Sequence, residues 1–151
     1  MKEKAGDFLR NHCPMARALG IEPVEFGGKK AKAVMHLDER QKNHYGMAHG
    51  GALFTLADIA AGMLATHLGY VTVTLSTNVT FFKPGTTPLI YAESEIMSDS
   101  GKVACIDVKI TDQAGTLLAE CGFLLYKKNP EHFKASLEKF GMLNKGGAQP
   151  E

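Results

Sequence analysis

The segment NHYGMAHGG (residues 43–51) runs without a break into the apolar stretch ALFTLADIAAGMLA (residues 52–65). Within that apolar stretch only Thr55 and Asp58 are polar, which predicts a helix buried on nearly every side. A carboxylate in such a helix is costly unless it is paired, hydrogen-bonded or neutral. Asp58 is therefore a candidate for a chemical role.

The glycines before the helix suggest a second functional feature. A helix start offers free backbone N–H groups and a positive dipole end, which suit a carbonyl oxygen that gains negative charge. Because a helix rises about 1.5 Å per residue, Asp58 lies roughly 12 Å beyond the His49-Gly50-Gly51 start. Both features can act on one substrate only if they come from two chains, so we expect an active site across a homodimer interface.

One face of the predicted helix supports this expectation. Thr55, Asp58, Gly62 and Ala65 recur at the spacing of a single stripe. Small side chains in a stripe let another backbone approach closely. We therefore expect this face to lie against a second copy of the chain.

Composition bounds the class of protein. The 151 residues, 44% hydrophobic and 22% charged, predict one soluble globular domain. A net charge of +1 without any long basic run gives no reason to expect a nucleic-acid or membrane partner. Three cysteines with no CxxC pair argue against a disulfide framework and favour a cytoplasmic location.

The two ends of the sequence indicate short flanks around a single domain. Residues 1–19 have no apolar run of signal-peptide length, and no apolar stretch is long enough for a membrane span. We expect a single domain over residues 1–143, with short helical flanks at both ends. The Gly-rich, polar segment 144–151 predicts a disordered tail.

Periodicity predicts the remaining elements. Residues 4–19 should form short helical turns interrupted at Pro14, and residues 23–37 a hairpin turning at Gly27-Gly28. Residues 89–97, 103–111 and 117–126 read as an antiparallel meander, and 130–140 as a final surface helix. One long strand should show an apolar and a hydroxyl-rich face, formed by alternation of Val71, Val73, Leu75, Val79 and Phe81 with Thr72, Thr74, Ser76, Asn78 and Thr80.

These elements have few compact arrangements. The simplest is an α+β fold in which a curved antiparallel sheet wraps round one long central helix. Such a sheet leaves edge strands through which a dimer could form.

The same residues resemble the hotdog-fold thioesterases, in particular acyl-CoA thioesterases of the phenylacetate-degradation (PaaI-like) type. Their pattern N-x-x-G-x-x-H-G-G followed by L-x-D is present here as Asn43, Gly46, His49, Gly50, Gly51, Leu56 and Asp58. The resemblance covers roughly residues 19–126 and includes the segment 78–84 and the Gly101-Lys102 turn. It implies a hotdog fold, a dimer with a continuous sheet that often pairs into a tetramer, and two interface sites per dimer.

The resemblance also implies roles for single residues. Asp58 would be the general base or nucleophile, the Gly50 N–H would bind the carbonyl oxygen, and Asn43 and His49 would polarise and position the substrate. Alignment places the residue that holds the attacking water at Thr74, although Thr72 and Ser76 share its predicted face. The expected substrate-binding residues are Gly51, Phe81, Phe82, Lys83, Pro84, Ser100, Gly101 and Lys102, with Lys83 and the 100–102 region meeting coenzyme A.

The resemblance therefore implies hydrolysis of an aromatic or medium-chain acyl-CoA to the free acid and coenzyme A. A thioester is already activated, so an acid and oriented N–H donors suffice, and neither a metal nor a cofactor is expected. Other interpretations stay open at this point: Asp58 as a structural hydrogen-bond hub, His49 as a helix cap, Phe81 and Phe82 as plain core. A non-catalytic acyl-CoA-binding regulatory module on the same fold is the alternative function.

Overall fold

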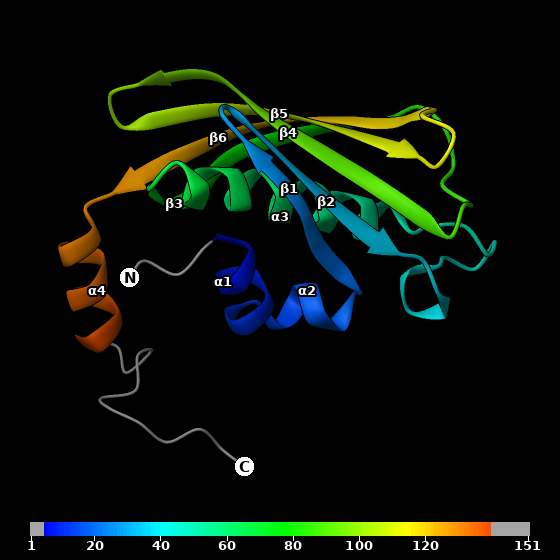
Figure 1. The fold of residues 1–151 in the computed structure, drawn as a ribbon, viewed down its shortest axis with the longest axis horizontal. Helices are drawn as coiled ribbons and strands as arrows, with labels where there is room; N and C mark the ends of the chain where they lie inside the picture. The colour runs from blue at the N-terminus through cyan, green and yellow to red at the C-terminus, as the bar shows by residue number, and fades with distance from the viewer. Residues whose placement is uncertain (1–4, 140–151) are drawn as a thin grey trace, which may run out of the picture.

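Six antiparallel strands form one curved sheet that wraps around a long helix (Figure 1). The computed structural model describes residues 5–139, so the predicted tail at 144–151 lies outside the described residues. The strand order is β1-β2-β4-β5-β6-β3. The strands are β1 (Ile21–Gly27), β2 (Lys30–His36), β3 (Val71–Phe81), β4 (Leu89–Ser100), β5 (Val103–Asp112) and β6 (Leu117–Lys128), and the helices are α1 (Ala5–His12), α2 (Pro14–Ala18), the 3-10 turn η1 (Glu39–Gln41), α3 (Gly50–His67) and α4 (Pro130–Lys139).

This arrangement confirms the predicted α+β architecture, with small differences in length. The strands β4 and β6 run three and two residues past their predicted ends at 97 and 126. The turn between β4 and β5 therefore contains only Gly101 and Lys102, rather than the four residues 98–101. Pro14 separates the two N-terminal helices and Pro130 begins the last one, both as predicted.

The central helix α3 packs its apolar residues against the concave face of the sheet. It begins two residues before the predicted run and ends two residues after it. The helix ends at His67, and the φ of +88° at Gly69 lets the Tyr70 N–H donate back to the Ala65 carbonyl at 2.9 Å. Nine residues of α3 are buried: Ala52, Leu53, Leu56, Ala57, Ala60, Ala61, Met63, Leu64 and Ala65.

The small-residue stripe on α3 is present, with one correction. Thr55, Asp58 and Gly62 are only partly buried, as expected for a face that the sheet leaves uncovered. Ala65 is fully buried, and Thr66 continues the exposed stripe instead. The reason is helical drift: ten residues at about 100° each place Ala65 roughly 80° away from Thr55, whereas Thr66 lies within about 20° of it.

The predicted two-faced alternation along β3 is wrong. A β-bulge between Thr74 and Ser76 inserts Leu75 into the pairing with β6, so the alternation reverses at that point. Thr74 faces α3 before the bulge and Phe81 faces it afterwards, since each contacts a residue of that helix. The bulge thus brings a hydroxyl and an aromatic ring to the same side of the sheet.

The strands β1 and β3 form the two edges of the sheet. Edge β3 is eleven residues long and carries apolar side chains in solvent, with Val73 38% and Leu75 57% exposed. Proteins seldom leave a long apolar edge uncovered, because its free N–H and C=O groups can pair with another chain. Among residues 5–139 no helix is long and apolar enough to cross a membrane.

Candidate active site

The loop before α3 is organised by the side chain of Asn43. Its Oδ1 accepts hydrogen bonds from the backbone N–H groups of Tyr45 (2.9 Å) and Met47 (3.1 Å). Its own backbone N–H donates to the Met47 carbonyl at 2.7 Å, which closes the loop on itself. Within residues 5–139 the Asn43 side-chain NH₂ group has no acceptor and is available to a ligand.

His49 caps the helix and thereby decides which N–H group stays free. Its Nδ1 accepts from the Gly51 N–H at 2.8 Å, so Nδ1 carries no proton and the neutral ring is protonated at Nε2. The Gly50 N–H, by contrast, finds no acceptor in the described part of the chain. The capping interpretation of His49 is confirmed, and the helix start presents one free N–H group at Gly50.

A pocket of about 290 Å³ opens in front of this N–H group. Phe81 lines this pocket, with its ring 3.3 Å from the position that a Cβ on Gly50 would occupy. Glycine at this position therefore allows the aromatic ring to lie close to the helix start. The pocket is lined by Asn43, Met47, Ala48, Gly50, Leu53, Phe81, Phe82, Lys83 and Pro84, which brings six of the predicted site residues together.

Asp58 lies two helical turns further along and faces a different cavity. Thr74 Oγ1 donates a hydrogen bond to Asp58 Oδ1 at 3.1 Å, which links α3 to the bulged part of β3. Ser76 lies on the opposite side of the bulge, and Thr72 lines the cavity without a hydrogen bond to the carboxylate. Of the three hydroxyl residues considered, Thr74 is therefore the one that touches the acid.

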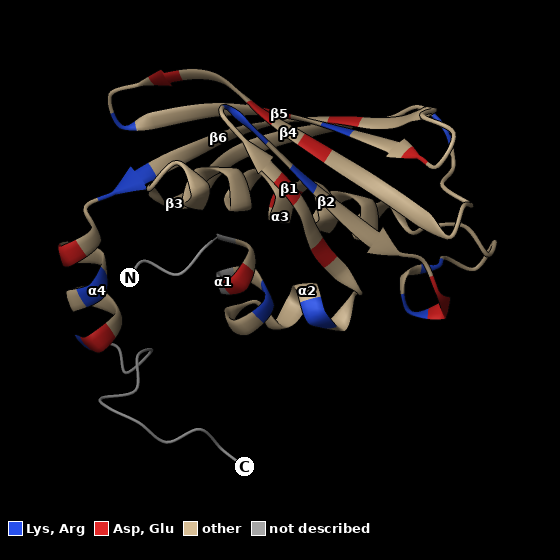
Figure 2. Cartoon of the chain, viewed as in Figure 1, with Lys and Arg blue, Asp and Glu red and all other residues tan. Residues whose placement is uncertain are grey.

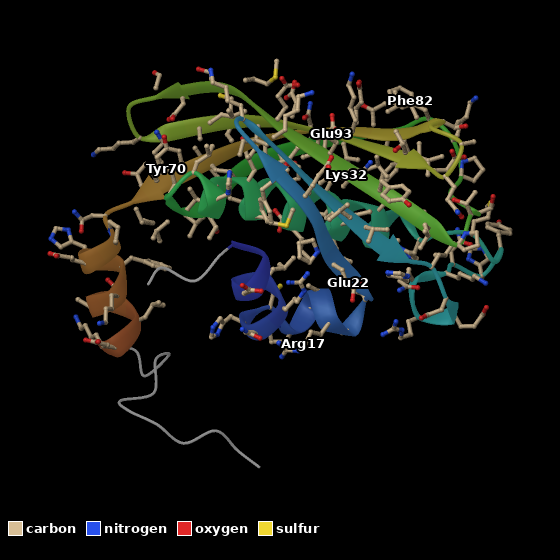
Figure 3. All side chains as sticks on the ribbon, in the orientation of Figure 1. Arg17, Glu22, Lys32, Tyr70, Phe82 and Glu93 are labelled. Atoms are coloured by element: carbon tan, nitrogen blue, oxygen red, sulfur yellow. The ribbon has the colours of Figure 1, made fainter. Side chains whose placement is uncertain are left out.

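The two halves of the predicted site do not meet within one chain. The Gly50 pocket and the cavity that contains Asp58 have no lining residue in common. Eight residues of helix separate the two, which corresponds to about 12 Å. Figure 3 labels Tyr70 and Phe82, which flank the two ends of β3 and lie at opposite ends of the sheet.

The predicted coenzyme A residues are also divided. Lys83 lies at the Gly50 pocket, whereas Lys102 lines a pocket of about 330 Å³ with Lys127, Lys128 and His132. Figure 2 shows the basic residues at the β4–β5 turn and at the end of β6, far from the loop before α3. Ser100, the last residue of β4, and Gly101 in the turn do not line that pocket.

Asp99 neutralises part of this basic cluster. Lys127 Nζ and the Tyr70 hydroxyl both donate hydrogen bonds to its carboxylate. The hydrogen bond from Lys127, with a smaller effect of the one from Tyr70, holds the pKa of Asp99 below its usual range. The hydrogen bond to Asp99 in turn raises the pKa of Tyr70. Lys102 and Lys128 have no acidic partner in the described part of the chain.

Several residues at the site carry no sequence pattern that could have revealed them. Gln41 is buried, donates to the carbonyls of Leu19 and His36, and accepts the His49 N–H on its own carbonyl at 2.7 Å. Gln41 therefore holds the loop before α3 in place from its buried side. Leu9, Cys13 and Phe133 line the Asp58 cavity although they lie far from it in the sequence.

Cys105 and Cys121 line neither the Gly50 pocket nor the Asp58 cavity. Burial raises the pKa of Cys121 to about 11, which keeps it protonated, and Cys105 lies within β5 as predicted. Over residues 5–139, no three His, Cys, Asp or Glu side chains come together in a way that could hold a metal ion.

Comparison with known proteins identifies the class. The family model of the thioesterase superfamily matches residues 45–119, which include the loop from Tyr45 onward, α3 and the strands β3 to β5. The acyl-coenzyme A thioesterase PaaI of Escherichia coli is 26% identical, with 65% of this chain and 71% of that protein covered. The acyl-coenzyme A thioesterase THEM4 of rat is 31% identical over 85% of this chain, which spans 56% of the rat protein's length.

A solved structure gives the same answer for the fold. A hypothetical thioesterase of Streptococcus pneumoniae, solved with coenzyme A, is 26% identical and superposes with a TM-score of 0.69 over 72% of this chain and 89% of that one. Of two further structures of that protein, one has alanine in place of an aspartate at position 52 and the other has alanine in place of a threonine at position 68. Asp58 and Thr74 have the same separation here. The chain belongs to the hotdog-fold thioesterase superfamily.

Proposed function

We propose that this protein, a thioesterase by family, hydrolyses acyl-CoA esters with an aromatic or medium-chain acyl group to the free acid and coenzyme A. The observation that carries the proposal is the Asp58 carboxylate, half-buried on α3, hydrogen-bonded by Thr74 and facing a cavity of about 510 Å³. The named relatives of this chain that act on acyl-coenzyme A, PaaI and THEM4, support the choice of substrate class.

Asp58 acts as the general base in this proposal. Thr74 donates to one carboxylate oxygen, which leaves the other oxygen to take a proton from water, and the threonine oxygen can itself accept a hydrogen bond from that water. The water oxygen bonds to the thioester carbon, the C–S bond breaks, and the departing sulfur takes the proton. The products are a carboxylic acid and the thiol of coenzyme A.

The Gly50 N–H stabilises the negative charge that forms on the carbonyl oxygen during attack. It is suited to this role because the His49 cap occupies the Gly51 N–H and leaves that of Gly50 free. Donation from one oriented N–H group of this kind is commonly worth about 100- to 1,000-fold in rate. The Asn43 NH₂ group, in the same pocket, is a second donor to the substrate.

A dimer formed through β3 brings these groups together. The strand runs from the Asp58 cavity at Val71 to the Gly50 pocket at Phe81. If two β3 edges pair antiparallel, each cavity end meets the partner's pocket end. Each of the two sites then has Asp58 from one chain and the Gly50 N–H from the other.

The same pairing unites the two basic regions. Lys102 lies at the Tyr70 end of the sheet and Lys83 at the Phe82 end, so they approach one another only between copies. Lysines from both chains would then face the phosphates of one coenzyme A.

Mixing two inactive variants tests the shared site. Asp58→Asn removes the base. Gly50→Pro removes the N–H group with little effect on the helix, because proline is favoured at the first helical position and His49, at ψ 138°, already has the extended conformation required before proline. In a dimer with one copy of each variant, one of the two sites keeps both Asp58 and the Gly50 N–H.

Equal amounts of the two variants, unfolded together and refolded, should recover about one quarter of wild-type thiol release, because about half of the dimers are mixed and each has one intact site. Gly50→Ala is the matched control, since it adds the same Cβ beside Phe81 but keeps the N–H. No recovery on mixing would mean that each site lies within one chain. Tight binding of acyl-CoA without thiol release by the wild-type protein would favour the non-catalytic binding module instead.

A further inference from the structure

The cavity beside Asp58 is longer than a catalytic carboxylate requires. It extends from Asp58 along α3 to Thr66 and Tyr70, between the α1–α2 junction, the start of β3 and Phe133 of α4. We propose that this cavity holds the acyl chain and selects saturated chains of about eight to twelve carbons, with Phe133 closing the far end. This inference rests on the proposed function and assigns its substrate.

The dimensions of the cavity set the chain length. Eight residues of α3 separate Asp58 from Thr66, which corresponds to about 12 Å. A zigzag chain with bonds of about 1.5 Å advances roughly 1.25 Å per carbon, so about ten carbons span that distance. The volume of about 510 Å³ is sufficient, since a methylene occupies about as much space as a water, roughly 30 Å³.

The lining of the cavity favours a hydrocarbon over a polar group. Leu9, Ile59 and Met63 present apolar side chains along its length. The polar groups near the far end are already hydrogen-bonded: the Thr66 hydroxyl donates to the Gly62 carbonyl at 3.0 Å and the Tyr70 hydroxyl donates to Asp99. Asp58 is the one carboxylate among the lining residues, so the ester group lies at that end and the chain points toward α4.

Phe133 is placed to limit the length. It lines the Asp58 cavity on one side and the basic pocket of Lys102 and Lys127 on the other. Its ring therefore separates an apolar compartment from a charged one. No residue of α4 is fully buried, and Phe133 is half-buried at the far end of the cavity.

Binding of non-hydrolysable analogues tests the inference without catalysis. In these probes a methylene replaces the thioester sulfur of butyryl-, octanoyl-, decanoyl- and tetradecanoyl-CoA. Calorimetry on the full-length protein should show affinity rising about fourfold for each added methylene up to about ten carbons, and no further rise beyond about twelve. Phe133→Ala should move this limit by about two to four carbons toward longer chains.

Leu137→Ala is the matched control. Leu137 lies one turn further along α4 and is similarly half-buried, but it does not line the cavity, so its truncation should leave the limit unchanged. Cys13 gives an independent readout, because it lines the cavity whereas Cys105 and Cys121 do not. The decanoyl analogue should slow alkylation of Cys13, measured by peptide mass spectrometry, and coenzyme A alone should not.

Affinity that does not depend on chain length, or an unprotected Cys13 at a saturating concentration of the decanoyl analogue, would overturn the assignment. An equal shift in Phe133→Ala and Leu137→Ala would show that α4 acts only through its overall packing and would overturn the role of Phe133. A different result would overturn the proposed function. In that case the analogues bind with the expected dependence on chain length, but wild-type protein releases no thiol from decanoyl-CoA.

Discussion

Replacing Thr74 by valine removes a single hydroxyl from the site and leaves the shape of the side chain almost unchanged. Valine is β-branched like threonine and is favoured in strands, so the bulge and the pairing with β6 should be retained. What is lost is the 3.1 Å hydrogen bond from Thr74 to the Asp58 carboxylate, together with the oxygen that holds the attacking water.

The size of the effect follows from the charge of the acceptor. A hydrogen bond to a charged group contributes about 1.5–3 kcal/mol, which corresponds to a fall in kcat of roughly 10- to 150-fold. Because Thr74 contacts the base and the water rather than the acyl chain, KM should change by less than about twofold. The assay is thiol release from decanoyl-CoA over a full range of substrate concentrations.

Two comparisons decide whether this reasoning is correct. Thr74→Ser keeps the hydroxyl and should retain most of the activity. In an Asp58→Asn background, Thr74→Val should cause little further loss, because the two residues act as one unit. Undiminished kcat in Thr74→Val, or losses that multiply independently in the double variant, would refute the pairing of these two residues in catalysis.

Three other perturbations test the His49 cap on α3, the β3 edge, and Asp38, the N-cap of η1. His49→Ala should lower stability by about 1 kcal/mol and Tm by about 2–4 °C through loss of the cap on α3, and His49→Asn, which can also cap, should recover most of this in thermal unfolding. Leu75→Lys on β3 should weaken the dimer and activity together in light scattering and thiol assays, whereas Val24→Lys, at a 48% exposed apolar position on the opposite edge, should change neither. The side-chain hydrogen bond from Arg40 lowers the pKa of Asp38 from 3.8 to about 2. The contribution of ionised Asp38 to folding stability is therefore present above about pH 4 and is lost as the pH falls toward 2. Urea unfolding between pH 2 and 6 should show a shallower acid decline in the stability of Asp38→Asn, and an unchanged decline would contradict this.

The sequence alone was sufficient for the elements whose pattern is local. The apolar run after Gly51 predicted α3, whereas the cap by His49 was one of the interpretations that the sequence left open. Turn residues and alternation predicted the meander of β4, β5 and β6 in the correct order, because tight turns force neighbouring strands to pair. The separation of Asp58 from Gly50 also follows from the rise of an α-helix, and this distance is what leads to the expectation of a site shared by two chains.

Tertiary structure decided the features that depend on a neighbouring element. The bulge at Leu75 depends on pairing with β6, and a strict period of two could not predict that Thr74 and Phe81 face the same side. The cavity beside Asp58 is assembled from α1, α3, β3 and α4, whose residues are up to 124 positions apart. A sequence determines its helices, turns and candidate chemistry through local periodicity, whereas a cavity is the space that distant elements leave when they pack, and no local pattern encodes that space.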